Sequence, residues 1–117
     1  MNTLRPDQID TTTTPVLDVR MRTGTKQIRG AIHYDPKALL EADPLVLPLP
    51  HDAPIAVYGD SERVLLAVID KLRRSGYGGA ARLEGGIEAW HDAGLPLEEA
   101  MQEQPVPGEE GSGLRRL

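Results

Sequence analysis

The sequence of 117 residues contains no cysteine, and this absence sets the first limit on its chemistry. Without cysteine there is no disulfide, no thiolate metal ligand and no cysteine nucleophile. Phenylalanine is also absent, and the aromatic residues are one Trp and three Tyr, so the core must consist of Leu, Val, Ile and Ala. No apolar run approaches the roughly 18 residues of a membrane span, and the N-terminus lacks the apolar stretch of a signal peptide. We therefore expect no membrane contact and a cytoplasmic location.

Charge and histidine spacing exclude further classes of function. The formal net charge is −5, which argues against nucleic-acid binding and against an anionic membrane surface. The three histidines, His33, His51 and His91, show no metal-ligand spacing, and no pair lies four residues apart on one helix. We therefore expect no metal site and no cofactor.

Short apolar segments alternate with helical patterns along the chain. The expected strands are 16–20, 30–34, 55–58 and 80–83, and the expected helices are 37–42, 61–75 and 87–93. This alternation predicts one α/β domain with a mostly parallel sheet and helices on both faces. We expect a polar lead-in over residues 1–13, the domain over 14–97, and a disordered acidic and polar tail over 98–117.

The stretch IAVYGDSERV, residues 55–64, is the most informative of the chain. An apolar strand runs directly into a helical pattern, and such a turn directs several backbone N–H groups at one point, where an anion can bind. A nucleophile would be expected at the strand end, but the residue there is Gly59. Ser61 is predicted to be the N-cap of the helix that follows.

Six segments in this order resemble the rhodanese-like family. They are VLDVR (16–20), IRGAIH (28–33), IAVYG (55–59), SGY (75–77), LEGGIEAW (83–90) and AGLPL (93–97), and the last two are the most specific. The resemblance implies a central five-stranded, mostly parallel sheet. In active members a cysteine ends the central strand, lies in a six-residue loop of backbone N–H groups, and transfers sulfane sulfur.

Carried onto this chain, the nucleophile position falls on Gly59, which has no side chain. The spacing to the Gly76-Tyr77 pair matches the family, so a residue has been substituted rather than deleted. The resemblance thus marks a degenerate active-site loop made of Gly59, Asp60, Ser61, Glu62, Arg63 and Val64. Two of these residues, Asp60 and Glu62, place carboxylates where active members hold an anion, and would repel thiosulfate or phosphate.

Charged residues near the loop have two interpretations each. Asp18 and Arg20, at the end of the first apolar strand, are either a remnant of substrate positioning or a hydrogen bond that supports the loop, and the second is favoured because buried carboxylates usually satisfy nearby donors. The basic stretch of Arg22, Lys26 and Arg29 either holds an anionic partner or is a solvated loop, and the solvated loop is favoured.

The sequence predicts a catalytically inactive rhodanese-like domain with no catalytic residue. Its function would be to recognise an unidentified protein partner or small ligand, in a regulatory role. Two alternatives stay open. One is an enzyme with altered chemistry in the loop of residues 59–64, using Ser61 or a thiol supplied by a partner. The other is a small-anion binder that uses backbone donors alone.

Overall fold

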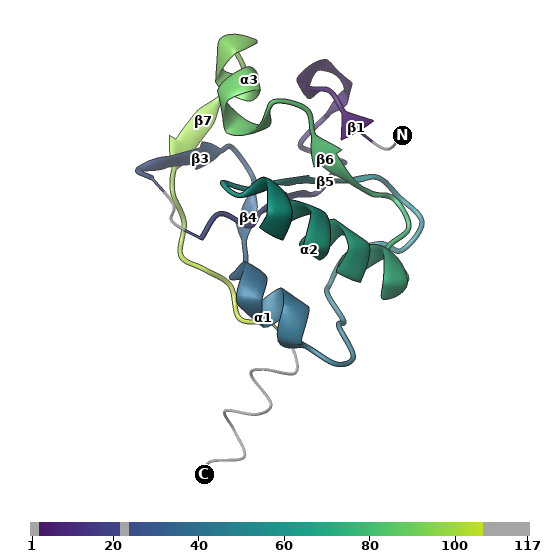
Figure 1. The fold of residues 1–117 in the computed structure, drawn as a ribbon. Coiled ribbons are helices and arrows are strands. Elements are labelled where there is room, and N and C mark those ends of the chain that lie inside the picture. Colours follow the sequence, from purple (N-terminus) through teal and green to yellow (C-terminus); the bar gives the residue numbers. More distant parts are fainter. Residues whose placement is uncertain (1–2, 22–23, 107–117) are drawn as a thin grey trace.

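A five-stranded parallel sheet forms the centre of the computed structural model, which describes residues 3–21 and 24–106 (Figure 1). The strand order is β1-β6-β5-β2-β4. The strands are β1 (Thr3–Leu4), β2 (Val16–Asp18), β4 (Ile32–His33), β5 (Ile55–Tyr58) and β6 (Ala80–Leu83). Every neighbouring pair in this sheet is parallel, which confirms the predicted α/β architecture with β5 as the central strand.

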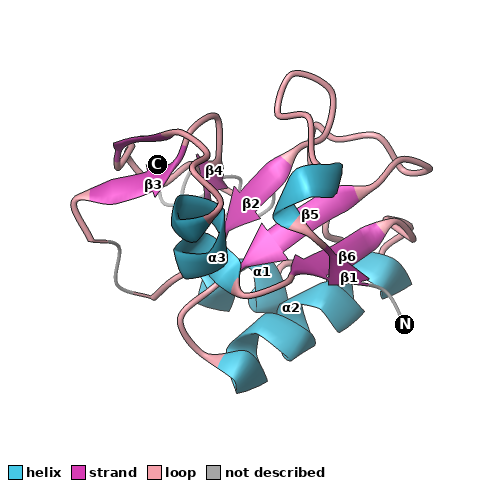
Figure 2. Cartoon of the chain, turned by 90° about the horizontal axis from the view of Figure 1, so that it is seen from above, coloured by secondary structure: helices cyan, strands magenta, loops and turns pink. Residues whose placement is uncertain are grey.

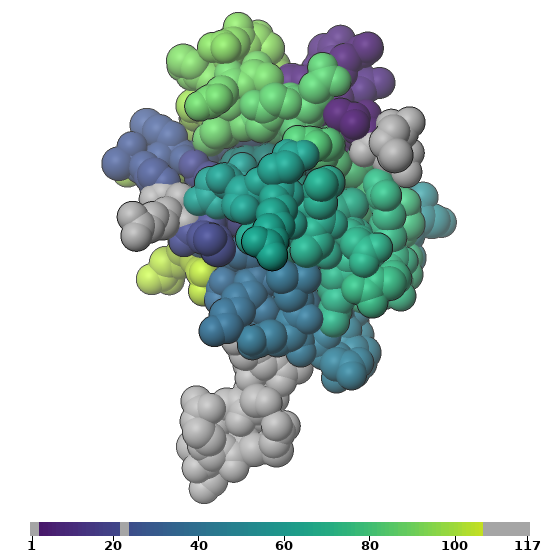
Figure 3. Space-filling view, in the orientation of Figure 1, coloured from purple at the N-terminus to yellow at the C-terminus, as the bar shows by residue number. Residues whose placement is uncertain are grey.

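Helices cover both faces of this sheet. Helices α1 (Pro36–Glu41) and α2 (Glu62–Arg74) lie side by side against one face, as Figures 2 and 3 show, and α3 (Gly86–Asp92) packs on the other. Successive side chains of a strand point to opposite faces, so β5 serves both cores. Ile55 and Val57 belong to the core with α1 and α2, whereas Ala56 and Tyr58 belong to the core with Trp90 of α3.

Helix α2 forms where the apolar pattern predicted it. Its buried side chains are Leu65, Val68, Ile69 and Leu72, which share one face. The helix ends before Gly76, whose φ of +102° is accessible to glycine at little cost. The chain reverses there, and the backbone N–H of Tyr77 donates to the carbonyl of Leu72 at 2.9 Å.

A second, two-stranded antiparallel sheet was not predicted from the sequence. Strand β3 (Lys26–Ile28) pairs with β7 (Leu97–Glu99), with Gln27 opposite Glu98. The residue pattern around β3 predicts a polar loop, and the composition from residue 98 onward predicts disorder. Both strands are three residues long, and neither shows alternation of apolar and polar residues over enough positions to be recognised.

The folded part extends beyond residues 14–97 at both ends. Strand β1 lies within the expected lead-in and pairs with β6 at one edge of the main sheet. After β7 the chain continues to Val106, whose side chain is buried in the core with α1 and α2. The remainder of the expected tail, residues 107–117, lies outside the described residues. None of the helices in the described ranges is long and apolar enough to cross a membrane.

Candidate functional site

The turn between β5 and α2 consists of residues 59–61 only. The Ser61 side chain accepts a hydrogen bond from the backbone N–H of Val64 at 3.3 Å, which confirms the predicted N-cap. The other half of the predicted loop, residues 62–64, lies in the first turn of α2. Residues 59–64 are therefore divided between a three-residue turn and the first turn of α2.

Gly59 is packed against the neighbouring strand end. The backbone N–H of Val19 donates to the carbonyl of Tyr58 at 2.8 Å, which holds the two chain segments together. A Cβ atom at Gly59 would lie 3.2 Å from Cγ2 of Val19 and 3.4 Å from its carbonyl oxygen. A side chain at the nucleophile position would therefore require Val19 to shift by a few tenths of an ångström.

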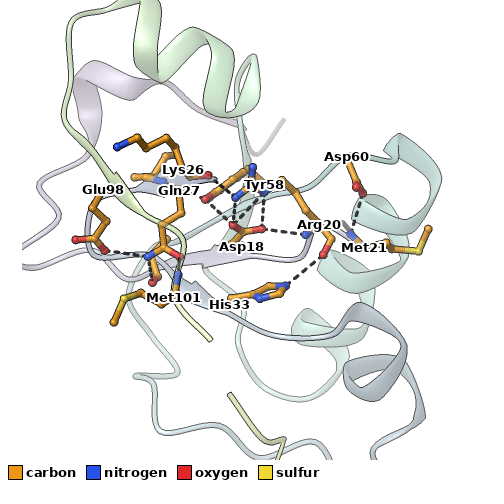
Figure 4. A network of polar contacts seen from close by, with 12 residues as sticks. Asp18, Arg20, Met21, Lys26, Gln27, His33, Tyr58, Asp60, Glu98 and Met101 are labelled. Atoms are coloured by element: carbon orange, nitrogen blue, oxygen red, sulfur yellow. Dashed lines mark hydrogen bonds and ion pairs between the residues drawn. The ribbon is translucent and has the colours of Figure 1, made fainter. Parts of the chain in front are cut away.

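The carboxylates of Asp60 in the turn and Glu62 at the start of α2 are both bonded within the chain. Asp60 Oδ1 accepts a hydrogen bond from the backbone N–H of Met21 at 3.0 Å, which ties the turn to the segment after β2 (Figure 4). Glu62 forms a two-point ion pair with Arg82 of β6, in which Nη1 lies 2.6 Å from Oε2 and Nη2 bonds Oε1. The hydrogen bond from Arg82 lowers the pKa of Glu62, and the same bond raises the pKa of Arg82.

A small hollow of about 190 Å³ lies beside this turn. It is lined by Tyr58, Gly59, Asp60, Glu62, Leu65, Arg82, Leu83, Gly85 and Gly86. The Arg82 guanidinium is the cation among these lining residues, and Glu62 neutralises it. The Asp60 carboxylate lines the same hollow and interacts electrostatically with Arg20, so an anionic ligand would have to compete with carboxylates that are already engaged within the chain.

Beneath the turn, Asp18 accepts hydrogen bonds from several donors and is fully buried. Arg20 donates through its backbone N–H at 3.0 Å, through Nε at 3.0 Å and through Nη2 at 2.7 Å. Tyr58 donates its hydroxyl to Asp18 Oδ2 at 2.8 Å (Figure 4). The register of the sheet explains this meeting, because Asp18 lies opposite both Tyr58 and His33 at the ends of three adjacent strands.

Burial and charge shift two pKa values in this network. Burial, and then the nearby Asp18 carboxylate, raises the pKa of the Tyr58 hydroxyl far above its ordinary value. Burial by itself would lower the pKa of Arg20, but its hydrogen bond and charge interaction with Asp18 raise the pKa above the ordinary value. Tyr58 is therefore a neutral donor and Arg20 a cation at neutral pH, and both serve the Asp18 carboxylate. This geometry favours the supporting role over the substrate-positioning one.

The other candidate residues are not brought together. His33 contacts the carbonyl of Arg20 at 3.3 Å, His51 stacks on Tyr77 with ring centroids 4.4 Å apart, and His91 is exposed on α3. Across residues 3–21 and 24–106, no cluster of His, Asp or Glu could hold a metal ion. In the basic stretch, Lys26 and Arg29 are exposed, and Arg22 lies outside the described residues.

Three residues of the site region are not predicted by local sequence patterns. Arg82 lies in a segment that predicts a short strand, and Gln27 and Glu98 lie in segments that predict a loop and a tail. Arg82 is the charged residue of the otherwise apolar segment 80–83, and this position could have indicated that it has an acidic partner. No local pattern marks Gln27 or Glu98, because their contact joins segments 71 residues apart.

Comparisons with known proteins agree with this fold. A family model described as "Rhodanese-like domain" matches residues 5–93, and the chain belongs to that family. No curated protein sequence matches the chain.

Solved structures with the same architecture include two from the Alr3790 protein of Anabaena sp. Its Rhodanese_3 like domain has 28% sequence identity and a TM-score of 0.63, with 78% of this chain and 97% of that one covered. Another structure, of its Rhodanese-like domain, has 30% identity and a TM-score of 0.62, with 74% of this chain and 81% of that one covered.

A thiosulfate sulfurtransferase from Pseudomonas aeruginosa is also similar, with 25% identity and a TM-score of 0.68. The match covers 83% of this chain but only 20% of that enzyme, so the likeness is to one part of a larger protein.

Proposed function

We propose that this chain is a rhodanese-like recognition module that does not itself catalyse sulfur transfer. The observation that carries the proposal is the residue at the end of β5. Sulfur transfer needs a polarizable nucleophile that is ionised near neutral pH, and Gly59 offers no side chain. The chain has no cysteine elsewhere that could take over this task.

The chemistry of the turn supports the same proposal. An anion approaching the hollow would meet the Asp60 carboxylate and would have to displace Glu62 from Arg82. Ser61 is not activated as a nucleophile, because its hydroxyl oxygen caps α2 and the contacts of the three histidines are made with other residues. The small-anion binder and the altered enzyme are therefore the weaker alternatives.

The first experiment is a thiosulfate:cyanide sulfurtransferase assay on the purified protein, with Ser61→Ala as its matched control. We expect no turnover by either protein above the uncatalysed rate. Turnover by the wild type that exceeds the Ser61→Ala variant would refute the proposal, because it would show that the turn retains chemistry of its own.

A thermal shift experiment tests anion binding separately. A ligand that binds only the folded state raises the melting temperature, and at 100 times its Kd it stabilises by about 2.7 kcal/mol. We expect millimolar sulfate, phosphate and thiosulfate to shift the wild type no more than sodium chloride at equal ionic strength. A selective shift by thiosulfate or phosphate would favour the anion-binder alternative.

Capture of a partner from native cells tests recognition directly. Asp60→Lys changes the charge at the turn, and Asp52→Lys makes the same change at an exposed position before the opposite end of β5. We expect a partner that binds the wild type and Asp52→Lys but is lost with Asp60→Lys. Equal loss with both variants would place the recognition surface elsewhere.

Gly59→Cys tests whether the turn kept the geometry of a sulfur-transfer loop. The new Cβ contacts Val19 at a distance that a small shift relieves, so we expect the variant to fold. We also expect it to form little persulfide from thiosulfate, because the Asp60 and Glu62 bonds are unchanged. Efficient persulfide formation, measured by mass spectrometry, would show instead that the loss of activity lies in the missing thiol alone.

A further inference from the structure

Strand β3 is attached to the candidate site by its backbone. The carbonyl of Lys26 accepts a hydrogen bond from Arg20 Nη2 at 2.9 Å, and the backbone N–H of Ile28 donates to the Tyr58 hydroxyl at 3.2 Å. The two residues that β3 contacts, Arg20 and Tyr58, are thus also the residues that donate to Asp18. Within the described residues β3 pairs with β7 and with no strand of the main sheet, so its position depends on such contacts.

The residue between these two attachments, Gln27, binds the C-terminal segment. Its side chain is fully buried, and Nε2 donates to Glu98 Oε2 at 2.9 Å and to the carbonyl of Ala31 at 3.0 Å. Its Oε1 accepts from the backbone N–H of Met101 at 3.0 Å. Glu98 also accepts from the backbone N–H of Gly30 at 3.0 Å. Apart from its bond to Ala31, the side-chain hydrogen bonds of Gln27 are therefore made with Glu98 and Met101 (Figure 4).

Residues 97–106 form a strap that crosses the edge of the main sheet. At its start, β7 pairs with β3. Further on, the backbone N–H of Gln104 donates to the carbonyl of His33 in the edge strand β4 at 2.7 Å, and Val106 is buried with only 1% of its surface exposed. Residues 101–105 are exposed and belong to no helix or strand, so between its ends the strap is held by the backbone bonds of Met101 and Gln104.

We propose that docking of this strap controls the geometry of the β5–α2 turn. The proposal rests on the function proposed above, and it names the regulation of that same surface. When the strap is docked, it holds β3, and β3 holds Arg20 and Tyr58. Arg20 in turn precedes Met21, whose backbone N–H binds Asp60. Release of the strap removes Glu98 and Met101 as partners of Gln27, loosens β3 and weakens the Met21–Asp60 contact at the turn.

Amide hydrogen exchange followed by NMR tests this coupling without any partner protein. Glu98→Ala removes the carboxylate that Gln27 and Gly30 bind. Glu99→Ala is the matched control, because it is the next residue and its carboxylate is 88% exposed and 3.7 Å from Lys26. We expect Glu98→Ala to raise the exchange rates of the Gln104, Ile28 and Met21 amides by about tenfold, with little change in Glu99→Ala. The Val19 amide, which is bonded to β5, reports global opening and should change less.

A second variant, Val106→Asp, releases the other end of the strap. We expect the Ile28 and Met21 amides to respond as they do in Glu98→Ala. The proposal is overturned if the Gln104 amide exchanges faster while Met21 does not, or if neither variant raises exchange at Gln104. These results leave the proposed recognition function untouched, because partner capture and the sulfurtransferase assay measure that function separately.

Discussion

Tyr58→Phe removes one oxygen atom from the buried network under the turn. The Tyr58 hydroxyl donates to the Asp18 carboxylate at 2.8 Å and accepts from the backbone N–H of Ile28 at 3.2 Å. A hydrogen bond to a charged group contributes about 1.5–3 kcal/mol, and a buried donor without a partner costs about 1–3 kcal/mol. Because Asp18 keeps its bonds to Arg20, we expect a total loss of about 2–4 kcal/mol in the free energy of unfolding.

Urea unfolding followed by the fluorescence of Trp90 measures this loss. Trp90 is the single tryptophan, is 2% exposed, and reports the loss of the core under α3. Tyr34→Phe is the matched control, because Tyr34 is 3% exposed and its hydroxyl takes no part in the Asp18 network. We expect the control to lose less than about 1 kcal/mol. A loss below about 0.5 kcal/mol for Tyr58→Phe would refute the reasoning.

The same substitution has a predicted pH dependence. The folded-state pKa of Tyr58 is raised, whereas an unfolded tyrosine titrates near pH 10. The folded state therefore retains a proton that the unfolded state releases, and this contribution to stability is complete below about pH 10 and is lost as the pH rises further. We expect the stability difference between the wild type and Tyr58→Phe to shrink above about pH 10. An unchanged difference would contradict the shifted pKa.

Two further predictions concern the ion pair at the turn and the packing of the sheet. Arg82→Gln removes the hydrogen bond that lowers the pKa of Glu62, so the NMR titration of the Glu62 carboxylate should move to higher pH; no movement would show that the pair does not persist in solution. Gly79→Ala would place a Cβ 2.2 Å from the backbone carbonyl oxygen of Ala53, and it should cost about 1–3 kcal/mol or more in urea unfolding. Gly78→Ala is its control, because that Cβ would meet no atom within 4 Å, and equal losses for both would contradict the close contact.

Long, strongly patterned segments were predictable from the sequence. The apolar run at Ile55 and the helical spacing from Leu65 to Leu72 identified β5 and α2, and Ser61 identified the start of the helix. These features depend on local residue order, which determines both backbone preference and which face is apolar. The absence of cysteine is also read directly from the sequence, without any structure.

Contacts between distant segments were not predictable in this way. Gln27 and Glu98 are 71 residues apart, and Glu62 and Arg82 are 20 apart. A polar residue in isolation gives no sign of which donor or acceptor it will meet, since hydrogen bonds are specific to a separation of about 3 Å. The sequence predicts that Asp60 and Glu62 repel an anion, but it does not show that Asp60 bonds to Met21 and Glu62 to Arg82.

The sequence by itself thus determined the α/β class, the family and the absence of cysteine, because residue identity and short-range spacing are sufficient for each. Only the tertiary structure decided that the turn is three residues long, that Asp60 bonds to Met21 and Glu62 to Arg82, and that the segment after residue 97 is docked on the sheet. Those features arise when strand ends align in register and bring together side chains that the sequence keeps apart.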